Sequence, residues 1–517
     1  MSPDGPLSAY RRHVREAPQA VASVQVAGDG SALADSPVPA ASAWAALAVL
    51  VVAVLAVRRI HRREAVARRR STSVTEPPSG PGVLSGAAAG SGTADVAAVW
   101  ESPDPRDEAL VIAFVIALGV AMVDSGASVT QVTATLRRVA AVNGVPEIAI
   151  AVLPTALFVS MPGAESVQTA IAPAGDSLRL DQVGAVFAVV DDAEAALIGP
   201  QAGLAALVAA GARPAPYAPW LRLAGYPLLA AGLILIVRGT WWEMLTAVVL
   251  ATGAGTLQLH RSEVPAAYRV FLPVATAFGC SLSVFLLIRA GADIGVFAPL
   301  LAVLVTFLPG AQLTTAVIEL ATGQMVAGVG RLAHGLMTLT LLAIGIVTAS
   351  QLVGVPAHSL PEPSLDGFGV LSPWLGVLVF GAGVVLTSSV ELPMARWVVS
   401  ILLVAYAGQV VGGTLLGEDL SAFTGALVMT PLAMLVAELP TGPPTLVTFM
   451  PAFWLLVPGA AGLAGVAKYL GDQRADGVTS LLAAGGSMLG IAFGVLLGLA
   501  VGAFLGLGSG VSMRAAP

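Results

Sequence analysis

The sequence predicts a polytopic α-helical membrane protein with a small α/β domain, and two observations carry this prediction. The chain of 517 residues is 56% hydrophobic and 11% charged, whereas soluble domains carry about 25% charged residues. Apolar runs of roughly 20 residues recur along the chain, and short polar breaks separate them. The formal net charge of −6 is small for this length, which argues against a nucleic-acid partner.

Residues 1–94 are predicted to form a disordered tail and a flexible linker around one apolar segment, because Pro, Ala, Ser and Gly dominate them. Residues 41–57 are that segment, and an arginine-rich cluster follows it directly. A cleaved signal peptide carries its charge before the apolar run, so this order indicates a signal anchor or an interfacial helix. Residues 41–57 are short for a span, so an extra N-terminal crossing is left open.

Residues 95–218 have the pattern of a compact α/β domain. Two helical runs end at the breaks Ser125-Gly126 and Asn143-Gly144. Short alternating segments follow, "EIAIAVLPTALFVSM" and "SVQTAIAP", and they predict strands with a turn at Pro154. Two more helices are expected from Asp181 and from Pro200. We expect this domain in the cytoplasm. That placement obeys the positive-inside rule at the basic loop after the second apolar segment, which then lies inside as well, whereas Lys468 and Arg474 would lie outside, against the rule.

From Trp220 onward about ten apolar segments follow, and they are predicted to be ten transmembrane helices in two halves of five. The first half covers residues 219–354, an external linker covers 355–369, and the second half covers 370–517. A shift of 149 residues lays Pro309-Gly310 on Pro458-Gly459, between the fourth and fifth segments of each half. Because each half has an odd number of spans, the second half crosses the membrane in the opposite orientation to the first. Inverted repeats with interrupted helices are typical of secondary transporters, whose site lies where the interruptions meet.

Hydrogen-bonding side chains follow the break at Pro309-Gly310 inside an apolar run, and this pattern predicts a binding site. Proline removes a backbone hydrogen bond, and a helix that resumes after Gly310 presents free N–H groups to a carboxylate. Gln312, Thr315 and Glu319 share one helical face beside Thr314, which suits a small zwitterion. The predicted substrate-binding residues are Pro309, Gly310, Gln312, Thr314, Thr315, Glu319, Pro458 and Gly459.

Two ionisable residues are candidates for proton coupling. Glu319 can take up and release a proton, as carboxylates inside membranes often do. His334 lies three residues after Arg331 and can act as a proton relay. The alternatives are a simple kink at Pro309 with Glu319 at the cytoplasmic surface, and a structural role for His334.

Enzyme and metal motifs are absent from the sequence. It contains no HExxH, no GxxxxGK[ST] and no cluster of His and Cys, and Cys280 is the sole cysteine. The sequence therefore predicts no enzyme, no catalytic residue, no metal and no cofactor, and the energy for transport is not expected to come from ATP bound by this chain.

Residues 107–507 resemble the threonine/serine exporters (ThrE-like). The family pattern P-G-x-x-L-T-N-A-x-x-D-L-x-x-G followed by G-x-x-R is matched at Pro309, Gly310, Leu313, Thr314, Ala316, Leu320, Gly323, Gly328 and Arg331. Thr315 stands in place of its asparagine and Glu319 in place of its aspartate. In the α/β domain, "SGA" (125–127) and "PTALFVS" (154–160) resemble family motifs, although Ser128 stands where the family usually has a glutamate.

The resemblance implies export of threonine, serine or a similar small hydroxy amino acid, driven by the proton gradient across the inner or plasma membrane. The expected partners are that amino acid, protons and the lipid bilayer, and a homo-oligomer is left open. Two rival functions also stay open. One is a transporter of another small solute, such as a dipeptide or an organic acid. The other is a membrane-anchored enzyme or regulator that acts through the α/β domain.

Overall fold

The structure is a computed structural model, and it describes residues 45–51, 105–162, 167–174, 177–354, 368–369, 371–417, 420–439, 441–456, 463, 465, 468 and 474–507. Residues 45–51 of the predicted apolar segment 41–57 are helical. The rest of that segment, and the predicted tail and linker on either side of it, lie outside the described residues. The predicted external linker is described only at residues 368–369.

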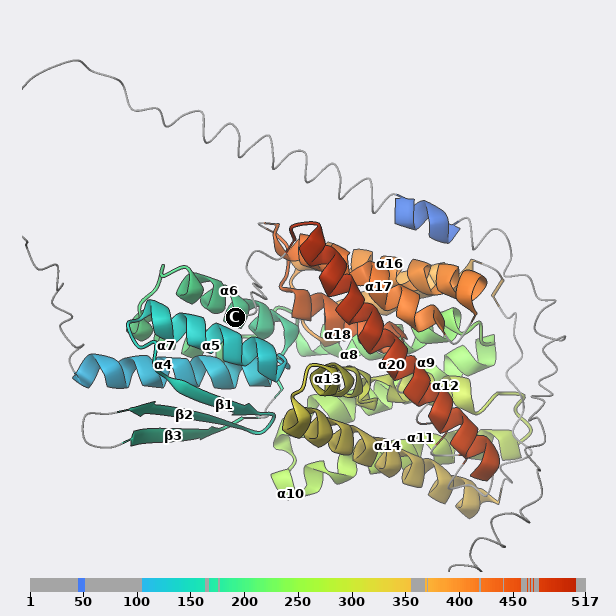
Figure 1. The fold of residues 1–517 in the computed structure, drawn as a ribbon. Helices are drawn as coiled ribbons and strands as arrows, with labels where there is room; N and C mark the ends of the chain where they lie inside the picture. The colour runs from blue at the N-terminus through green and yellow to red at the C-terminus, as the bar shows by residue number, and fades with distance from the viewer. Residues whose placement is uncertain are drawn as a thin grey trace, which may run out of the picture. The chain divides into compact units, whose positions relative to one another are not determined.

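Residues 105–218, here called the helix-and-sheet region, combine four helices with one antiparallel sheet (Figure 1). The strands are β1 (Ala149–Leu153), β2 (Ala156–Pro162) and β3 (Val167–Pro173), paired in that order. The helices are α4 (Pro105–Asp124), α5 (Val129–Val142), α6 (Leu180–Glu194) and α7 (Pro200–Gly211). The predicted strands and helices are confirmed as elements, while the domain boundaries 95–218 stay a prediction.

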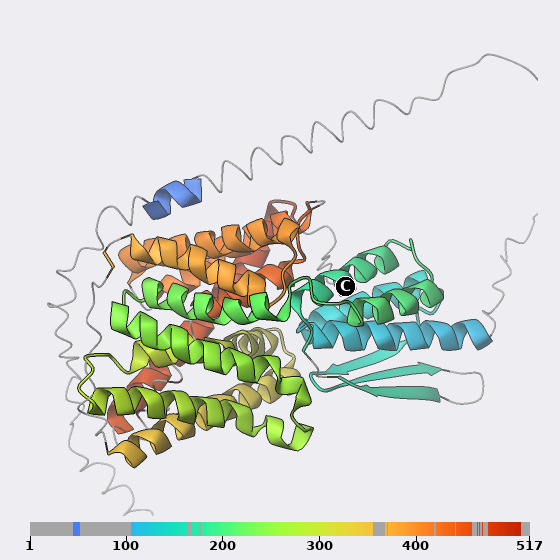
Figure 2. The same cartoon turned by 180° about the vertical axis from the view of Figure 1, so that it is seen from behind.

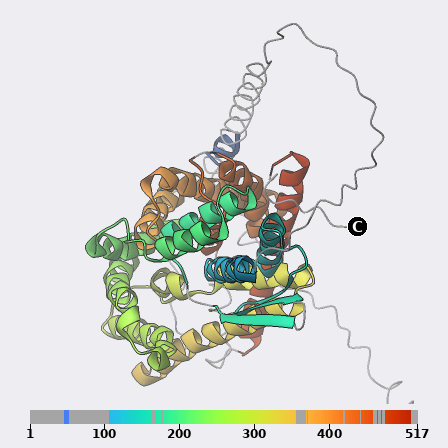
Figure 3. The ribbon, with the colours of Figure 1, turned by 90° about the vertical axis from the view of Figure 1, so that its left-hand side faces the viewer.

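Helix α4 forms the centre of this region because it packs against the other three helices and against β2 and β3 (Figure 3). Phe114, Leu118 and Met122 recur every four residues on one face of α4, and all three are fully buried. Gly203 lets α7 approach this face closely, since a Cβ there would lie 2.3 Å from the Phe114 ring.

Two sets of helices follow the helix-and-sheet region. The first helix set is α8 (Pro219–Ile236), α9 (Trp241–Leu259), α10 (Ala266–Arg269), α11 (Phe271–Arg289), α12 (Phe297–Leu304), α13 (Gly310–Ala321) and α14 (Met325–Val353), with short 3-10 turns at Arg261–Glu263 and Val305–Phe307. The second helix set is α15 (Ser372–Thr387), α16 (Leu392–Leu416), α17 (Ser421–Ala437), α18 (Thr445–Leu456) and α20 (Arg474–Phe504). Each of the predicted apolar segments overlaps one or more of these helices.

Fewer of these helices than predicted are long and apolar enough to cross a membrane. By length and composition the described residues contain five, namely α8, α11, α14, α16 and residues Gly477–Phe504 of α20. A sixth arises if the bent pair Phe297–Phe307 and Gly310–Ala321 counts as one span. Helices α15, α17 and α18 are apolar but shorter. The chain is thus a largely helical, multi-pass membrane protein, and the count of ten spans stays a prediction.

The first helices of the two sets, α8 and α15, pack together through glycines (Figure 2). Gly225 lies against the backbone of Gly383, and Gly232 lies against the backbone of Gly376. A Cβ at Gly232 would come within 2.4 Å of the Phe380 backbone nitrogen, so even alanine would push the helices apart. Close backbone approach through small residues is a common way to pack helices in membranes, where burial of apolar surface gives no driving force between them.

A fully buried glutamate fixes the turn between α11 and α12. One carboxylate oxygen of Glu243 accepts a hydrogen bond from the Thr240 backbone N–H at 2.7 Å, and the other accepts one from the Gly295 N–H at 2.9 Å. Thr240 completes a capping box at the start of α9, because its hydroxyl accepts from the Glu243 N–H. The carboxylate therefore has a structural explanation that needs no ligand.

Candidate functional site

The predicted break between the fourth and fifth apolar segments is present. The chain bends by 63° between Phe297–Phe307 and Gly310–Ala321. Leu308, Pro309 and Gly310 at the bend are buried, and Pro309 is the N-cap of α13 without a side-chain hydrogen bond. The first N–H groups of a helix have no acceptor within that helix. The bend therefore places a polar helix start in a buried position, where it can meet an anionic group.

Burial increases along the predicted polar face of α13. Gln312 is exposed, Thr315 is half-buried, and Glu319 is fully buried. Thr314 is also fully buried, and its hydroxyl has no hydrogen-bond partner among the described residues. A buried hydroxyl is normally satisfied, because leaving it unpaired costs about 1–3 kcal/mol. Thr314 is thus the predicted site residue with an unused polar group inside the protein.

Glu319 has two partners, one on the next helix and one 190 positions away in the chain. Its Oε2 lies 3.1 Å from Nε of Arg331 on α14, and its Oε1 accepts a hydrogen bond from the Val129 backbone N–H at 3.1 Å. Arg331 also donates from Nη2 to the carbonyl of Ala127 at 3.2 Å. These four residues are here called the buried contact. Binding a ligand ammonium or a proton at Glu319 would require the carboxylate to exchange one of these partners.

Local structure explains why Val129 offers its N–H to Glu319. Gly126 adopts a positive φ of 85°, which turns the chain between α4 and α5. Ser128 is the N-cap of α5, and its hydroxyl accepts from the Gln131 N–H. Val129 is the first residue of α5, so its N–H lies at the positive end of the helix dipole, where a carboxylate is stabilised.

The remaining predicted residues lie apart from this cluster or cannot be placed. His334 is exposed on α14. Pro458 and Gly459 lie outside the described residues, two and three positions after the last residue of α18, Leu456. Helix α13 nevertheless packs against α18 and α20, so the first break lies beside the second helix set.

Sequence reasoning missed Arg331 as the partner of Glu319 and missed Ala127 and Val129 as its neighbours. Two signals could have found the arginine. A carboxylate buried at membrane depth needs a cation, and Arg331 follows Glu319 in the matched motif. Nothing local marks Val129, because it lies 190 positions away from Glu319.

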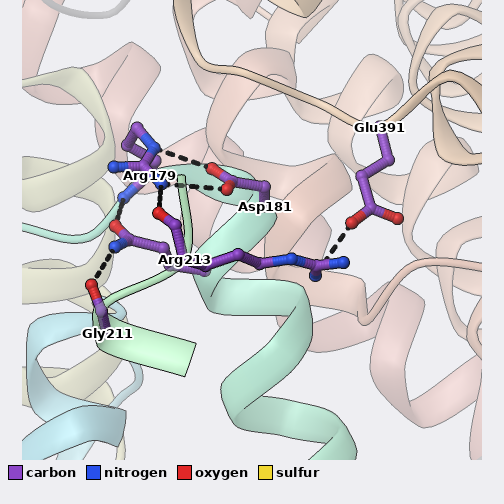
Figure 4. A network of polar contacts seen from close by, with 6 residues as sticks. Arg179, Asp181, Gly211, Arg213 and Glu391 are labelled. Atoms are coloured by element: carbon purple, nitrogen blue, oxygen red, sulfur yellow. Dashed lines mark hydrogen bonds and ion pairs between the residues drawn. The ribbon is translucent and has the colours of Figure 1, made fainter. Parts of the chain in front are cut away.

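A second contact joins the helix-and-sheet region to the second helix set (Figure 4). The Arg179 guanidinium binds both carboxylate oxygens of Asp181, at 3.0 and 3.1 Å, and donates to the Arg213 carbonyl at 2.6 Å. Arg213 in turn lies 2.8 Å from a carboxylate oxygen of Glu391, in the turn between α15 and α16. Arg179 thereby holds the segment that carries Arg213 against α6.

Two further hydrogen bonds reach the same turn. The Tyr217 hydroxyl donates to the Val390 carbonyl at 2.7 Å, and the Leu180 N–H donates to the Ser388 carbonyl at 3.1 Å. The Arg213–Glu391 ion pair and these two bonds are here called the exposed contact. A cavity of about 480 Å³ lies beside it, lined by Asp181, Arg213, Tyr217 and Glu391 among others. All the charged groups in this lining already have ionic partners.

No group of three or more His, Cys, Asp or Glu side chains able to hold a metal ion occurs in the part of the chain that the structure describes. The features on which a function can rest are therefore the buried helix break with Thr314 and the two contacts of the helix-and-sheet region.

The long apolar helices place this chain in the class of multi-pass membrane proteins. One of its apolar helices is interrupted at a buried position. Residues 113–353 match the family model described as "Putative threonine/serine exporter". Over this stretch the chain is similar to the threonine/serine exporter family, and the predicted resemblance is confirmed. The matched stretch contains all four residues of the buried contact.

One curated relative supports the same family. A protein of Mycobacterium tuberculosis (strain ATCC 25618 / H37Rv), named "Probable threonine/serine exporter", is 27% identical to this chain over 296 residues. The match covers 54% of this chain and 54% of that protein, so it spans about half the length of the relative. No solved structure matches the chain.

Proposed function

We propose that this protein is a secondary transporter that exports a small hydroxy amino acid, threonine or serine, across the inner or plasma membrane. The helix-and-sheet region is cytoplasmic, and ten spans in two inverted halves enclose the substrate near the two Pro-Gly breaks. The proton gradient drives export, with Glu319 or His334 as the coupling group. No enzymatic step is part of this proposal.

The observation that carries the proposal is the buried helix break with an unpaired hydroxyl one turn beyond it. The start of α13 offers N–H groups to a substrate carboxylate. Thr314 is the fifth residue of α13, and its hydroxyl is buried without a partner. Leaving this hydroxyl unpaired costs free energy when no substrate is bound. A threonine or serine molecule carries both a carboxylate and a hydroxyl, so it can satisfy both features at once.

Helix packing supports the inverted halves. Within the first set α11 packs against α14 and α9 against α12, and within the second set α17 packs against α20 and α16 against α18. The third and fifth segments, and the second and fourth, thus form the same pairs in both sets. The glycines of α8 and α15 also pair reciprocally. Gly225, the earlier one on α8, lies against Gly383, the later one on α15, and Gly232 lies against Gly376. Two equivalent helices related by a two-fold axis pair in this way.

The contacts of the helix-and-sheet region support the odd number of spans per half. The region contacts α13 and α14 near the turn between the fourth and fifth segments, and it contacts the α15–α16 turn between the sixth and seventh. These two turns lie on one side of a membrane when every segment crosses it once. The five or six spans allowed by helix length alone would need some of the shorter helices to stop within the bilayer.

The test is flux of labelled threonine and of labelled serine in proteoliposomes under an imposed pH gradient, with two matched variants. Thr314→Val keeps the shape and removes the hydroxyl, whereas Thr314→Ser keeps the hydroxyl. A hydrogen bond lost from a buried site costs about 1.4 kcal/mol or more, so flux through Thr314→Val should fall about tenfold or further. Thr314→Ser should retain most of the flux.

Two results would count against the proposal. Equal flux through wild type and Thr314→Val would remove Thr314 from the binding site. Absence of wild-type flux for both amino acids would exclude them as substrates, and dipeptides and organic acids would then be assayed in the same vesicles.

A further inference from the structure

The helix-and-sheet region is bound to both helix sets. The buried contact joins it to the first set through Glu319 on α13 and Arg331 on α14. The exposed contact joins it to the second set at the α15–α16 turn. In a transporter whose halves move against each other, a rigid element bound to both halves prevents the movement on its own side.

We propose that the helix-and-sheet region gates the site, and that the exposed contact opens and closes in each transport cycle while the region stays bound to the first helix set. The proposal rests on the proposed function, because it assumes that the two helix sets move relative to each other. With both contacts formed, the site is closed on the side of the helix-and-sheet region. When the exposed contact opens, the region moves with the first set and the site opens on that side.

The difference in exposure identifies the contact that opens. In the buried contact the Arg331 side chain is 12% exposed and the Glu319 side chain 0%. In the exposed contact the Arg213 side chain is 46% exposed and the Glu391 side chain 27%. Separating a buried pair leaves charges that water cannot reach, whereas separating a hydrated pair lets water replace each partner. The exposed contact is therefore the one that can be broken and reformed quickly.

The apolar part of the interface with the second set is also adaptable. The terminal methyl of Met450 on α18 lies beside Gly126, where a Cβ would come within 2.7 Å of it, and Met394 on α16 lies beside Gly184. Methionine side chains are flexible and polarisable, so such contacts can re-form in more than one arrangement. These contacts need no fixed geometry when the region moves.

The α15–α16 turn is strained when the exposed contact is formed. Ser389 has a φ of 59°, in the left-handed region that residues with a Cβ rarely adopt. Its hydroxyl is fully buried and has no hydrogen-bond partner within the described residues. Strain of this kind is common in segments that switch between two conformations. Opening the contact would allow Ser389 to relax and its hydroxyl to reach water.

The test is a reversible covalent link across the exposed contact in the full-length protein. Cys280→Ala removes the native thiol, and Arg213→Cys with Glu391→Cys supplies two partly exposed thiols in place of the ion pair. A short bifunctional methanethiosulfonate reagent joins them, and dithiothreitol removes the link. The matched control is Ser160→Cys with Thr169→Cys, whose side-chain oxygens lie 3.1 Å apart on neighbouring strands within the helix-and-sheet region.

The link at 213 and 391 should lower threonine and serine flux by at least about tenfold, and reduction should restore it. The same reagent on the control pair should leave the flux unchanged. Flux that continues at the unlinked rate through protein with a complete link would overturn the proposal, because the contact would then stay closed throughout transport.

A second measurement does not depend on the substrate. Hydrogen exchange of residues 310–316 reports access of water to the start of α13. Linked protein should exchange these amides more slowly than unlinked protein, and the control link should have no effect. If neither amino acid is transported but the exchange rate of residues 310–316 falls in the linked protein, the proposed function is wrong and the gating proposal is supported. If flux is normal and the exchange rate of residues 310–316 does not change with the link, the gating proposal is wrong and the proposed function is supported.

Discussion

The two contacts of the helix-and-sheet region use the same chemistry in different surroundings. Each contains one arginine–glutamate pair and at least one hydrogen bond to backbone, yet Glu319 is fully buried and Glu391 borders a cavity of about 480 Å³. Coulomb attraction between unit charges is several times stronger at low dielectric than in water, and so is the penalty for leaving one charge alone. The same residue types therefore form a contact that is costly to open in one place and a contact that is easier to open in the other.

Each contact also contains a backbone amide that reports its state. The Val129 N–H is bonded to Glu319 in the buried contact, and the Leu180 N–H is bonded to Ser388 in the exposed contact. Hydrogen exchange at an amide reports the free energy of the opening that breaks its bond. Peptides that contain Val129 and Leu180 therefore measure the two contacts separately in one experiment.

Replacing Arg331 with methionine should have the largest effect. The change leaves the Glu319 carboxylate buried without a cation, and breaking a buried pair in this way costs about 3–5 kcal/mol. Exchange at Val129 should become roughly 150- to 5,000-fold faster, while exchange in strands β2 and β3 should not change. Deuterium uptake followed by mass spectrometry of the full-length protein measures both.

The double variant Arg331→Met with Glu319→Gln is the control for this effect. With both charges removed, no lone ion remains buried, so part of the lost protection at Val129 should return. Exchange in the double variant that is as fast as in Arg331→Met alone would mean that packing, and not the ion pair, holds the buried contact.

Glu319→Gln alone should have an intermediate effect and can separate two roles of this residue. The amide oxygen can still accept from the Val129 N–H, and the Arg331 guanidinium that loses its ion pair is 12% exposed and keeps its bond to the Ala127 carbonyl, so the cost should be roughly 1–3 kcal/mol. If Glu319 also carries the coupling proton, threonine flux in the variant should no longer follow the imposed pH gradient. If Glu319 only docks the helix-and-sheet region, flux should be slower and should still follow the gradient.

The sequence predicted what depends on neighbouring residues. Pro309-Gly310 marks a helix break, because proline lacks an N–H and glycine permits a change of direction, and the bend is found there. The strands around Pro154 follow from the alternation of apolar residues, and the apolar segments follow from the length of continuous apolar runs. The spacing of Gln312, Thr315 and Glu319 also placed them correctly on one face of α13.

The sequence could not predict which positions along that face are buried, or which groups they meet. Burial of Glu319 depends on α14 and on a loop 190 positions away, and no local pattern encodes such a contact. The ion pair of Glu391 could not be predicted either, since the approach of Arg213 from the helix-and-sheet region is a tertiary contact. The role of Pro458 and Gly459 stays a prediction because they lie outside the described residues.

Tyr217→Phe should have a small effect confined to the exposed contact. Loss of one hydrogen bond to a carbonyl costs about 1 kcal/mol, so exchange at Leu180 should become roughly fivefold faster, with no change at Val129. Burial, and then the charge of Glu391, raise the pKa of Tyr217 above its ordinary value of 10.0. The stability that this bond gives is therefore fully present below the ordinary pKa and is lost as the pH rises through the raised one.

Alkaline titration can check the pKa of Tyr217 directly. The ultraviolet absorbance of the wild type minus that of Tyr217→Phe isolates the ionisation of this one phenol. Its midpoint should lie above the value for free tyrosine. A midpoint at or below that value would mean that Tyr217 is hydrated, and would remove its bond from the exposed contact.

Arg213→Gln should have the smallest effect and gives the sharpest test of the comparison. The pair is partly hydrated, and such pairs contribute about 0–1 kcal/mol, so exchange at Leu180 should rise at most roughly fivefold. Added salt should reproduce part of this rise in the wild type by screening the pair, and it should leave the protection at Val129 unchanged. Glu391→Gln should behave like Arg213→Gln, and the double variant should add nothing, because either change removes the same interaction. An effect at Val129 as large as that of Arg331→Met would show that the two contacts open as one unit, and the helix-and-sheet region could not then release the second helix set while holding the first.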